Sequence, residues 1–189
     1  MMLKAIDFAT KAHVAQKRKG TEIPYIVHPV SVGMVLLQAG APEEAIVAGI
    51  LHDTLEDTKT TLVDIQREFG HDVAAIVQGC SEPDKSLEWK DRKRHTIEHL
   101  KTASPEVLMV VCADKLDNVR DIAWSLRHVG DKVWQRFNRG RQDQEWYYRE
   151  ILLNVRALYD HPQGHIVRML WEELAYEVDM VFGKLTDEE

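Results

Sequence analysis

The segment Leu51-His-Asp-Thr-Leu-Glu-Asp-Thr58 follows a continuous apolar run and gathers an imidazole and three carboxylates within six residues. Residues four apart lie on one side of a helix, so His52 is expected beside Glu56, and Asp53 beside Asp57. The preceding apolar residues indicate that this helix is largely buried. A buried helix ending in carboxylates is unusual without a purpose, so the segment predicts a packed helical fold with a site inside it.

The residues alone leave two interpretations of this acidic cluster open. Carboxylates that face a cavity repel one another, and a bound cation would relieve the repulsion. The alternative is the solvent-exposed end of a helix, because acidic residues are common on protein surfaces. Negative charge at a helix C-terminus opposes the helix dipole, which favours the cation site.

Two other segments offer metal-ligand chemistry. Pro24-Tyr-Ile-Val-His-Pro29 holds an imidazole, His28, where a turn leads into a helix. In Ala113-Asp-Lys-Leu-Asp-Asn118, Asp114 follows a second apolar run and lies four residues before Asn118. Two histidines with two aspartates form a mixed nitrogen and oxygen ligand set, which suits Mn²⁺, Fe²⁺ or Zn²⁺ better than Mg²⁺ or Ca²⁺.

Apolar residues recur at helical spacing along the rest of the chain, and no segment alternates with the period of a strand. Pro, Ser, Thr and Gly residues mark where helices begin and end. These patterns predict an all-α fold, a compact multi-helix assembly rather than a four-helix bundle. The expected helices span residues 2–17, 29–40, 42–55, 60–70, 71–80, 88–102, 104–129, 144–159 and 165–182.

Composition narrows the classes of protein and partner. The 189 residues carry 24 Lys and Arg against 31 Asp and Glu, a formal net charge of −7. An acidic total argues against nucleic-acid polymers and anionic membranes as partners, and the longest apolar runs are far shorter than a membrane span. Two cysteines without a Cys-x-x-Cys motif favour a reduced, cytoplasmic setting. The length predicts one domain over residues 1–189.

Four motifs in this order resemble those of a known enzyme family. They are Gln16-Lys-Arg-Lys-Gly20, Pro24–Pro29, Leu51–Thr58 and Ala113–Asn118. Together they resemble HD-domain metal-dependent phosphohydrolases, in particular the hydrolase domain of RelA/SpoT-type enzymes and the small stand-alone alarmone hydrolases. The resemblance covers residues 3–160, and a C-terminal helix over residues 163–183 follows it.

The resemblance implies roles for specific residues. One Mn²⁺, or another divalent transition metal, would be bound by His28, His52, Asp53 and Asp114. Glu56 and Asp57 match the pair that positions and activates the attacking water. Expected contacts to the substrate come from Arg18, Lys19, Tyr25, Lys90, Asn118 and Tyr147. Arg92–Arg94 are also basic, and a solvated helix face is the favoured interpretation of that run.

The implied reaction removes the 3′-pyrophosphate of the nucleotides ppGpp and pppGpp, giving GDP or GTP and pyrophosphate. Two residues depart from the family pattern, Asp117 where an aromatic residue or His is usual and Trp89 where some members have a basic residue. They keep open another phosphorylated nucleotide as substrate, such as NADPH or a nucleoside phosphate. A non-catalytic nucleotide-binding module is a third hypothesis.

Overall fold

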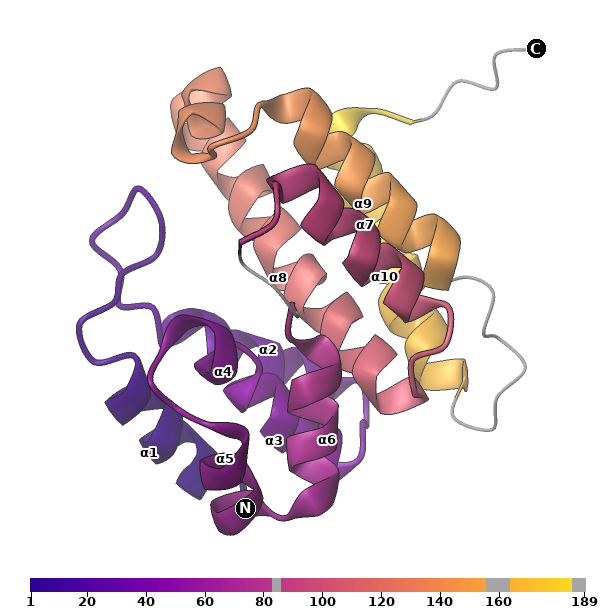
Figure 1. The fold of residues 1–189 in the computed structure, drawn as a ribbon. Helices are drawn as coiled ribbons and strands as arrows, with labels where there is room; N and C mark the ends of the chain where they lie inside the picture. Colours follow the sequence, from indigo (N-terminus) through magenta and orange to yellow (C-terminus); the bar gives the residue numbers. More distant parts are fainter. Residues whose placement is uncertain (83–85, 156–163, 185–189) are drawn as a thin grey trace.

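A computed structural model describes residues 1–82, 86–155 and 164–184, and this part of the chain is built from helices (Figure 1). No β-strand occurs among these residues, and Lys17 and Pro24 form an isolated bridge. The all-α prediction is therefore confirmed. The helices are α1 (Met2–Ala12), α2 (Val27–Gln38), α3 (Glu43–Leu51), α4 (Thr54–Asp57), α5 (Leu62–Phe69), α6 (His71–Cys80), α7 (Trp89–Leu100), α8 (Pro105–Val129), the 3₁₀ helix η1 (Gly130–Arg136), α9 (Arg141–Val155) and α10 (Gly164–Phe182).

Helix α8 is the element around which the others pack. It begins with Pro105 at its first position, and the Ser104 hydroxyl accepts a hydrogen bond from the backbone N–H of Val107 at 3.4 Å. Every residue from Val107 to Asp114 is buried. The helix contacts α2, α3 and α6 from the first half of the chain and α10 and η1 from the second (Figure 1). Burial on all sides explains why this stretch is continuously apolar until Asp114.

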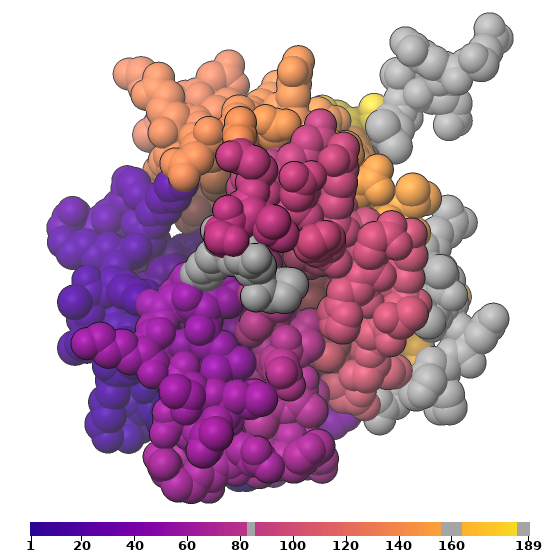
Figure 2. All heavy atoms as spheres, viewed as in Figure 1, coloured from indigo at the N-terminus to yellow at the C-terminus, as the bar shows by residue number. Residues whose placement is uncertain are grey.

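Helices α2 and α3 pack closely because glycines lie at their contact. All residues of α3 from Ala45 to Leu51 are buried. A Cβ added to Gly33 of α2 would lie 2.5 Å from Cγ1 of Ile50, which is closer than real contacts allow. This close packing sets the position of the end of α3, where the acidic segment begins. Figure 2 shows the segments up to α6 mainly at the lower left of the surface and those from α7 to α9 mainly at the upper right.

The structure differs from the sequence prediction at three described places. The first helix ends at Ala12 rather than residue 17, because the chain turns toward the Lys17–Pro24 bridge. The helix predicted over residues 42–55 breaks after Leu51, since the Thr54 hydroxyl donates to the Leu51 carbonyl at 2.6 Å and competes with the backbone ladder. The 3₁₀ helix η1 was not predicted.

Two predicted boundaries, the helix end at residue 159 and the helix start at residue 163, lie outside the described residues. Within the described part, no helix has the length and apolar character that crossing a membrane requires. Buried apolar residues of the helices α1–α3 and α5–α10 form one connected cluster.

We expect Gly33→Ala to lower the free energy of unfolding by about 1–3 kcal/mol, because the new methyl group must displace the buried, β-branched Ile50. Urea denaturation measures the change. Gly140→Ala is the matched control, since nothing lies within 4 Å of a Cβ placed there. Equal stability of the two variants would contradict the close packing of α2 on α3.

Candidate metal and anion-binding site

Three separate segments bring two imidazoles and a carboxylate together in the interior. His28 lies in the first turn of α2, His52 in the turn after α3, and Asp114 in the middle of α8. One ligand atom from each of the three lies within 4.8 Å of the others. The Nε2 atoms of His28 and His52 lie 3.2 and 3.7 Å from Oδ1 of Asp114. Such a cluster can hold a metal ion.

Asp53 completes this group. Its Oδ2 atom lies 3.0 Å from Nε2 of His52 and 3.7 Å from Nε2 of His28. The phenol of Tyr25 donates a hydrogen bond to the same oxygen. The four predicted ligands are thus brought together, although the break after Leu51 means that helical spacing is not what aligns them.

Both histidines direct Nε2 into the cluster because Nδ1 is engaged elsewhere. Nδ1 of His52 lies 2.8 Å from the Gly49 carbonyl, and Nδ1 of His28 lies 2.6 Å from Oδ2 of Asp117. A carbonyl and a carboxylate can only accept, so Nδ1 carries a proton in each ring. Nε2 of His52 is buried, and the nearby Asp53 and Asp114 oxygens do not meet it in hydrogen-bond geometry. A buried nitrogen without a hydrogen bond, beside two carboxylates, fits a divalent transition metal.

The charges of the cluster are strongly interdependent. Burial lowers the pKa of His52, but the Asp53 and Asp114 carboxylates outweigh burial and raise it to about 9. Burial raises the pKa of Asp53, but His52 and His28 outweigh it and the net shift is downward. The pKa of Asp114 is also lowered, since Lys115 and the histidines outweigh burial. Without metal, protons on the histidines balance the carboxylates.

A small cavity of about 160 Å³ opens beside the cluster. Glu56 lines it, and its Oε1 atom accepts a hydrogen bond from the backbone N–H of Glu82 at 2.6 Å. This bond holds the Glu56 carboxylate at the edge of the metal cluster. Asp57 is exposed and lines neither this cavity nor its larger neighbour, so the two members of the predicted catalytic pair lie in different surroundings.

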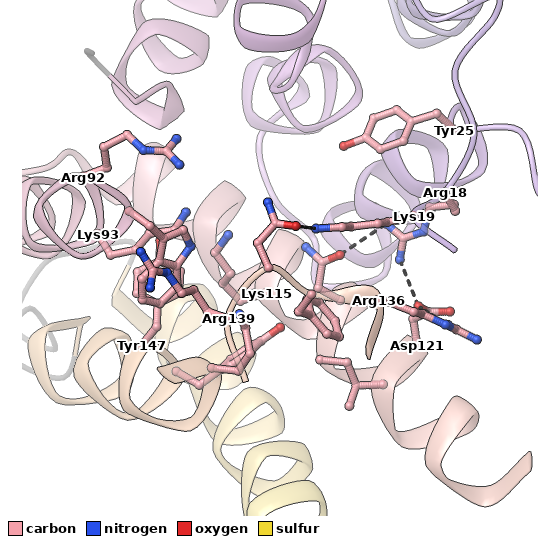
Figure 3. A pocket seen from close by; sticks show the side chains of 17 residues that line it. Arg18, Lys19, Tyr25, Arg92, Lys93, Lys115, Asp121, Arg136, Arg139 and Tyr147 are labelled. Carbon is pink, nitrogen blue, oxygen red and sulfur yellow. Dashed lines mark hydrogen bonds and ion pairs between the residues drawn. The ribbon is translucent and has the colours of Figure 1, made fainter. Parts of the chain in front are cut away.

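A larger cavity of about 430 Å³ adjoins the first, and the two share five lining residues, among them Tyr25, Asn118 and Tyr147. Its lining is strongly cationic, with one carboxylate, Asp121. Figure 3 shows the cations of α7 on one side and those of the α1–α2 loop on the other. The seven cationic side chains are Arg18, Lys19, Arg92, Lys93, Lys115, Arg136 and Arg139.

Aromatic rings lie against several of these cations. The ammonium of Lys93 lies 4.7 Å from the centroid of the Tyr147 ring, and that of Lys115 lies 5.5 Å from it. Tyr147 and Tyr148 are both buried, and both line the larger cavity. Tyr147 is therefore part of the cavity wall as well as of the core. A cavity with this charge and these rings suits an anionic ligand that has a planar group.

Lys90 is the one predicted contact that the structure does not bring to either cavity. Helix periodicity explains why, because Lys90 shares a face with Arg94 and Ile97, and this face borders a separate groove. Trp89, Arg92 and Lys93 line the larger cavity. Lys90 lies on another face, 5.4 Å from the centroid of the Trp146 ring in that groove. Arg92 does not lie on a solvated helix face as expected, because it lines the larger cavity and its side chain pairs with Glu82 at 2.7 Å.

The structure also adds residues that sequence analysis missed. Lys115 lies between the two cavities, with its Nζ atom 2.7 Å from Oδ2 of Asp114. Arg136 and Arg139 enter the larger cavity from η1 and the loop after it. Their basic character was the only available signal, since no predicted element covered them. Lys115 lies inside a quoted motif and was passed over for its acidic neighbours.

Comparison with known proteins identifies the family. The HD-domain family model matches residues 5–145, about three quarters of the chain. The chain belongs to the HD-domain family. It is 40% identical over 138 residues to the Danio rerio guanosine-3′,5′-bis(diphosphate) 3′-pyrophosphohydrolase MESH1, which covers 68% of this chain and 76% of that protein.

Two solved structures have the same fold. A Listeria monocytogenes protein, lmo0812, gives a TM-score of 0.75 at 39% identity over 83% of this chain and 99% of that chain. A second structure, a metazoan ortholog of SpoT that hydrolyzes ppGpp, gives a TM-score of 0.73 at 27% identity over 93% and 94% of the two chains. The similarity extends over most of both molecules.

We expect His52→Ala to lose bound metal, because it removes one of the ligand nitrogens of the cluster. In the wild-type protein, Mn²⁺ at 100 times its dissociation constant should raise the free energy of unfolding by about 2.7 kcal/mol. His71→Ala, at an exposed position, is the matched control. Mass spectrometry of dialysed protein counts the metal, and an unchanged content in His52→Ala would exclude this ligand.

The metal affinity should depend on pH. The pKa of His52 is about 6.5 in the unfolded chain and is raised to about 9 in the folded protein. Protonation of His52 therefore stabilises the metal-free fold fully below about pH 6.5, and this stabilisation is lost as the pH rises through about 9. Metal must displace the same proton, so the apparent affinity for Mn²⁺ should rise from about pH 7 to about pH 9. Calorimetric titration across that range measures it, and a constant affinity would show that no proton is displaced.

Proposed function

We propose that this protein hydrolyses the 3′-pyrophosphate of ppGpp and pppGpp, giving GDP or GTP and pyrophosphate. The observation that carries the proposal is the cluster of His28, His52 and Asp114, which lines a small cavity that adjoins a larger one lined by seven cations. A polyphosphate needs cationic partners, and hydrolysis needs an activated water beside them. The Danio rerio relative is named for this reaction and the metazoan SpoT ortholog hydrolyzes ppGpp, which supports the same substrate here.

We propose Mn²⁺ as the metal, bound by His28, His52, Asp53 and Asp114. The mixed donor set supports a transition metal over Mg²⁺ or Ca²⁺. When bound, such a metal supplies Lewis-acid chemistry, lowering the pKa of water and withdrawing charge from phosphoryl oxygens. Tyr25, whose phenol donates to Asp53, holds that carboxylate in its ligating orientation.

Glu56 is the general base of the proposal. Its carboxylate lines the metal cavity, and the backbone N–H of Glu82 fixes one of its oxygens. From that place it orients the attacking water and accepts its proton. Asp57 lines neither cavity, so we do not assign the proton transfer to it. We assign it a supporting electrostatic role, in which its carboxylate adds negative charge near the metal cluster.

The substrate is held by residues of both cavities. Arg18, Lys19 and Asn118 approach from the α1–α2 loop and α8, and Tyr147 offers a ring against which the base stacks. We replace Lys90 in this role by Arg92 and Lys93, since these two line the cavity and Lys90 does not. The expectations of a single domain over residues 1–189 and of a cytoplasmic setting remain predictions.

Another phosphorylated nucleotide is supported less well than ppGpp. One reason to consider it was Asp117, whose carboxylate lines neither cavity and contacts His28 instead. Trp89 does line the larger cavity, so it keeps its place as a determinant of substrate choice. The cationic lining also favours a ligand with several phosphates over a nucleoside monophosphate.

The direct test is a substrate panel with Mn²⁺-loaded protein. We expect pyrophosphate release from ppGpp with a kcat/KM well above the kcat/KM for hydrolysis of NADPH or GTP. No release from ppGpp, with one metal ion verified per chain, would exclude the proposed reaction. Tight binding of ppGpp without turnover would favour a non-catalytic binding module.

Glu56→Gln should lower kcat by about 10²- to 10⁴-fold, because the amide cannot accept the proton of the attacking water. The metal content should stay at the wild-type level, since Glu56 is not among the proposed ligands. Glu172→Gln on α10, whose carboxylate pairs with Arg168 at 2.9 Å, is the matched control and should keep full activity. Wild-type turnover in Glu56→Gln would remove this residue from the reaction.

A further inference from the structure

We propose that Asp117 is a positioning residue that holds His28 in its ligating tautomer and strengthens it as a metal ligand. Asp117 lies on α8 three residues after Asp114, so it follows that proposed ligand on nearly the same face of the helix. The inference rests on the proposed metal site, and it assigns a role to the residue that departs most clearly from the family pattern.

The geometry around Asp117 is a closed set of contacts. Its Oδ2 atom accepts from Nδ1 of His28 at 2.6 Å, and its Oδ1 atom accepts from the hydroxyl of Ser31. Ser31 lies one turn after His28 on α2, so both contacts join α8 to the same face of α2. The guanidinium of Arg18 lies 3.7 Å from Oδ2. Two hydrogen-bond donors and one cation therefore orient this carboxylate.

Asp117 lies outside both cavities. Its side chain is 16% exposed and lines neither cavity. The carboxylate meets the imidazole with the Arg18 guanidinium 3.7 Å away, a cation that balances its negative charge. An ionised carboxylate behind a histidine fixes the ring orientation and makes the opposite nitrogen more basic.

The two histidines differ in this respect. His52 has a neutral partner, the Gly49 carbonyl, and His28 has a charged one. A charged acceptor forms the stronger hydrogen bond, so His28 is the more firmly oriented and more electron-rich of the two. An aromatic side chain at position 117 could not supply that charge. The departure from the family pattern therefore changes the support of the metal rather than the surface that meets the substrate.

Arg18 extends this arrangement to the larger cavity. Its guanidinium donates to Oδ1 of Asn118 at 3.2 Å, and the Asn118 amide donates to Oδ1 of Asp114 at 2.5 Å. Arg18 thus contacts the partners of two proposed ligands, Asp117 behind His28 and Asn118 beside Asp114. Because Arg18 also lines the larger cavity, it holds Asp117 in place from the side where an anionic ligand would bind.

The test measures Mn²⁺ affinity by calorimetric titration in Asp117→Ala and Asp117→Asn. We expect Asp117→Ala to weaken binding about 10- to 100-fold. Asp117→Asn retains an acceptor oxygen but no charge, so its loss should be smaller than that of Asp117→Ala. Asp121→Asn is the matched control, since Asp121 also lies 3.7 Å from Arg18 but contacts no histidine, and its metal affinity should stay within about twofold of wild type.

A second readout separates positioning from a general structural effect. With Zn²⁺ as a diamagnetic probe, the Nδ1 proton of His28 should give a slowly exchanging NMR signal in the wild-type protein, and Asp117→Ala should lose it. Affinity in Asp117→Ala equal to that of Asp121→Asn, or an unchanged Nδ1 signal, would overturn the inference. A wild-type protein that binds no metal would instead contradict the proposed metal site itself.

Discussion

The structure depends on one electrostatic constraint, which is that Asp114 sits in a buried stretch of α8 and needs positive partners there. Burying an isolated carboxylate is far too costly for a folded domain to tolerate. His28, His52 and Lys115 meet that need from α2, the turn after α3 and α8 itself. The close packing of α2 on α3 and of both on α8 serves to bring these groups within 4 Å of the carboxylate. The same packing that builds the core therefore builds the metal cluster.

A second consequence concerns the distribution of charge. The chain is acidic overall, with a net charge of −7, yet the larger cavity carries seven cations and one carboxylate. Helix α7 produces part of this difference, since its periodicity sends Arg92 and Lys93 to the cavity and Lys90 to a separate groove. A chain with net negative charge can therefore still offer a small polyanion a cationic cavity. The net charge alone does not describe the ligand that this cavity suits.

The sequence predicts the helical class and the grouping of His28, His52, Asp53 and Asp114, because the apolar runs and the ordered motifs carry that information directly. It mispredicts the path of the segment after Leu51, since the Thr54 hydroxyl that ends α3 acts through a contact that helical periodicity does not report. The roles of Lys115 and Asp117 depend on which side chains meet across α2 and α8, so they require the tertiary structure. Arg136 and Arg139 belong to a segment without a clear local pattern, and only packing brings them to the cavity.

The central claim is that the four side chains bind one divalent metal beside the cationic cavity. Anomalous diffraction at the manganese edge, from crystals of the Mn²⁺-loaded protein, tests it most directly. The account predicts a single strong peak within coordination distance of His28, His52, Asp53 and Asp114, at the edge of the cavity that Glu56 lines. A peak at any other group of residues, or none at this cluster in protein that carries one metal ion per chain, would contradict it.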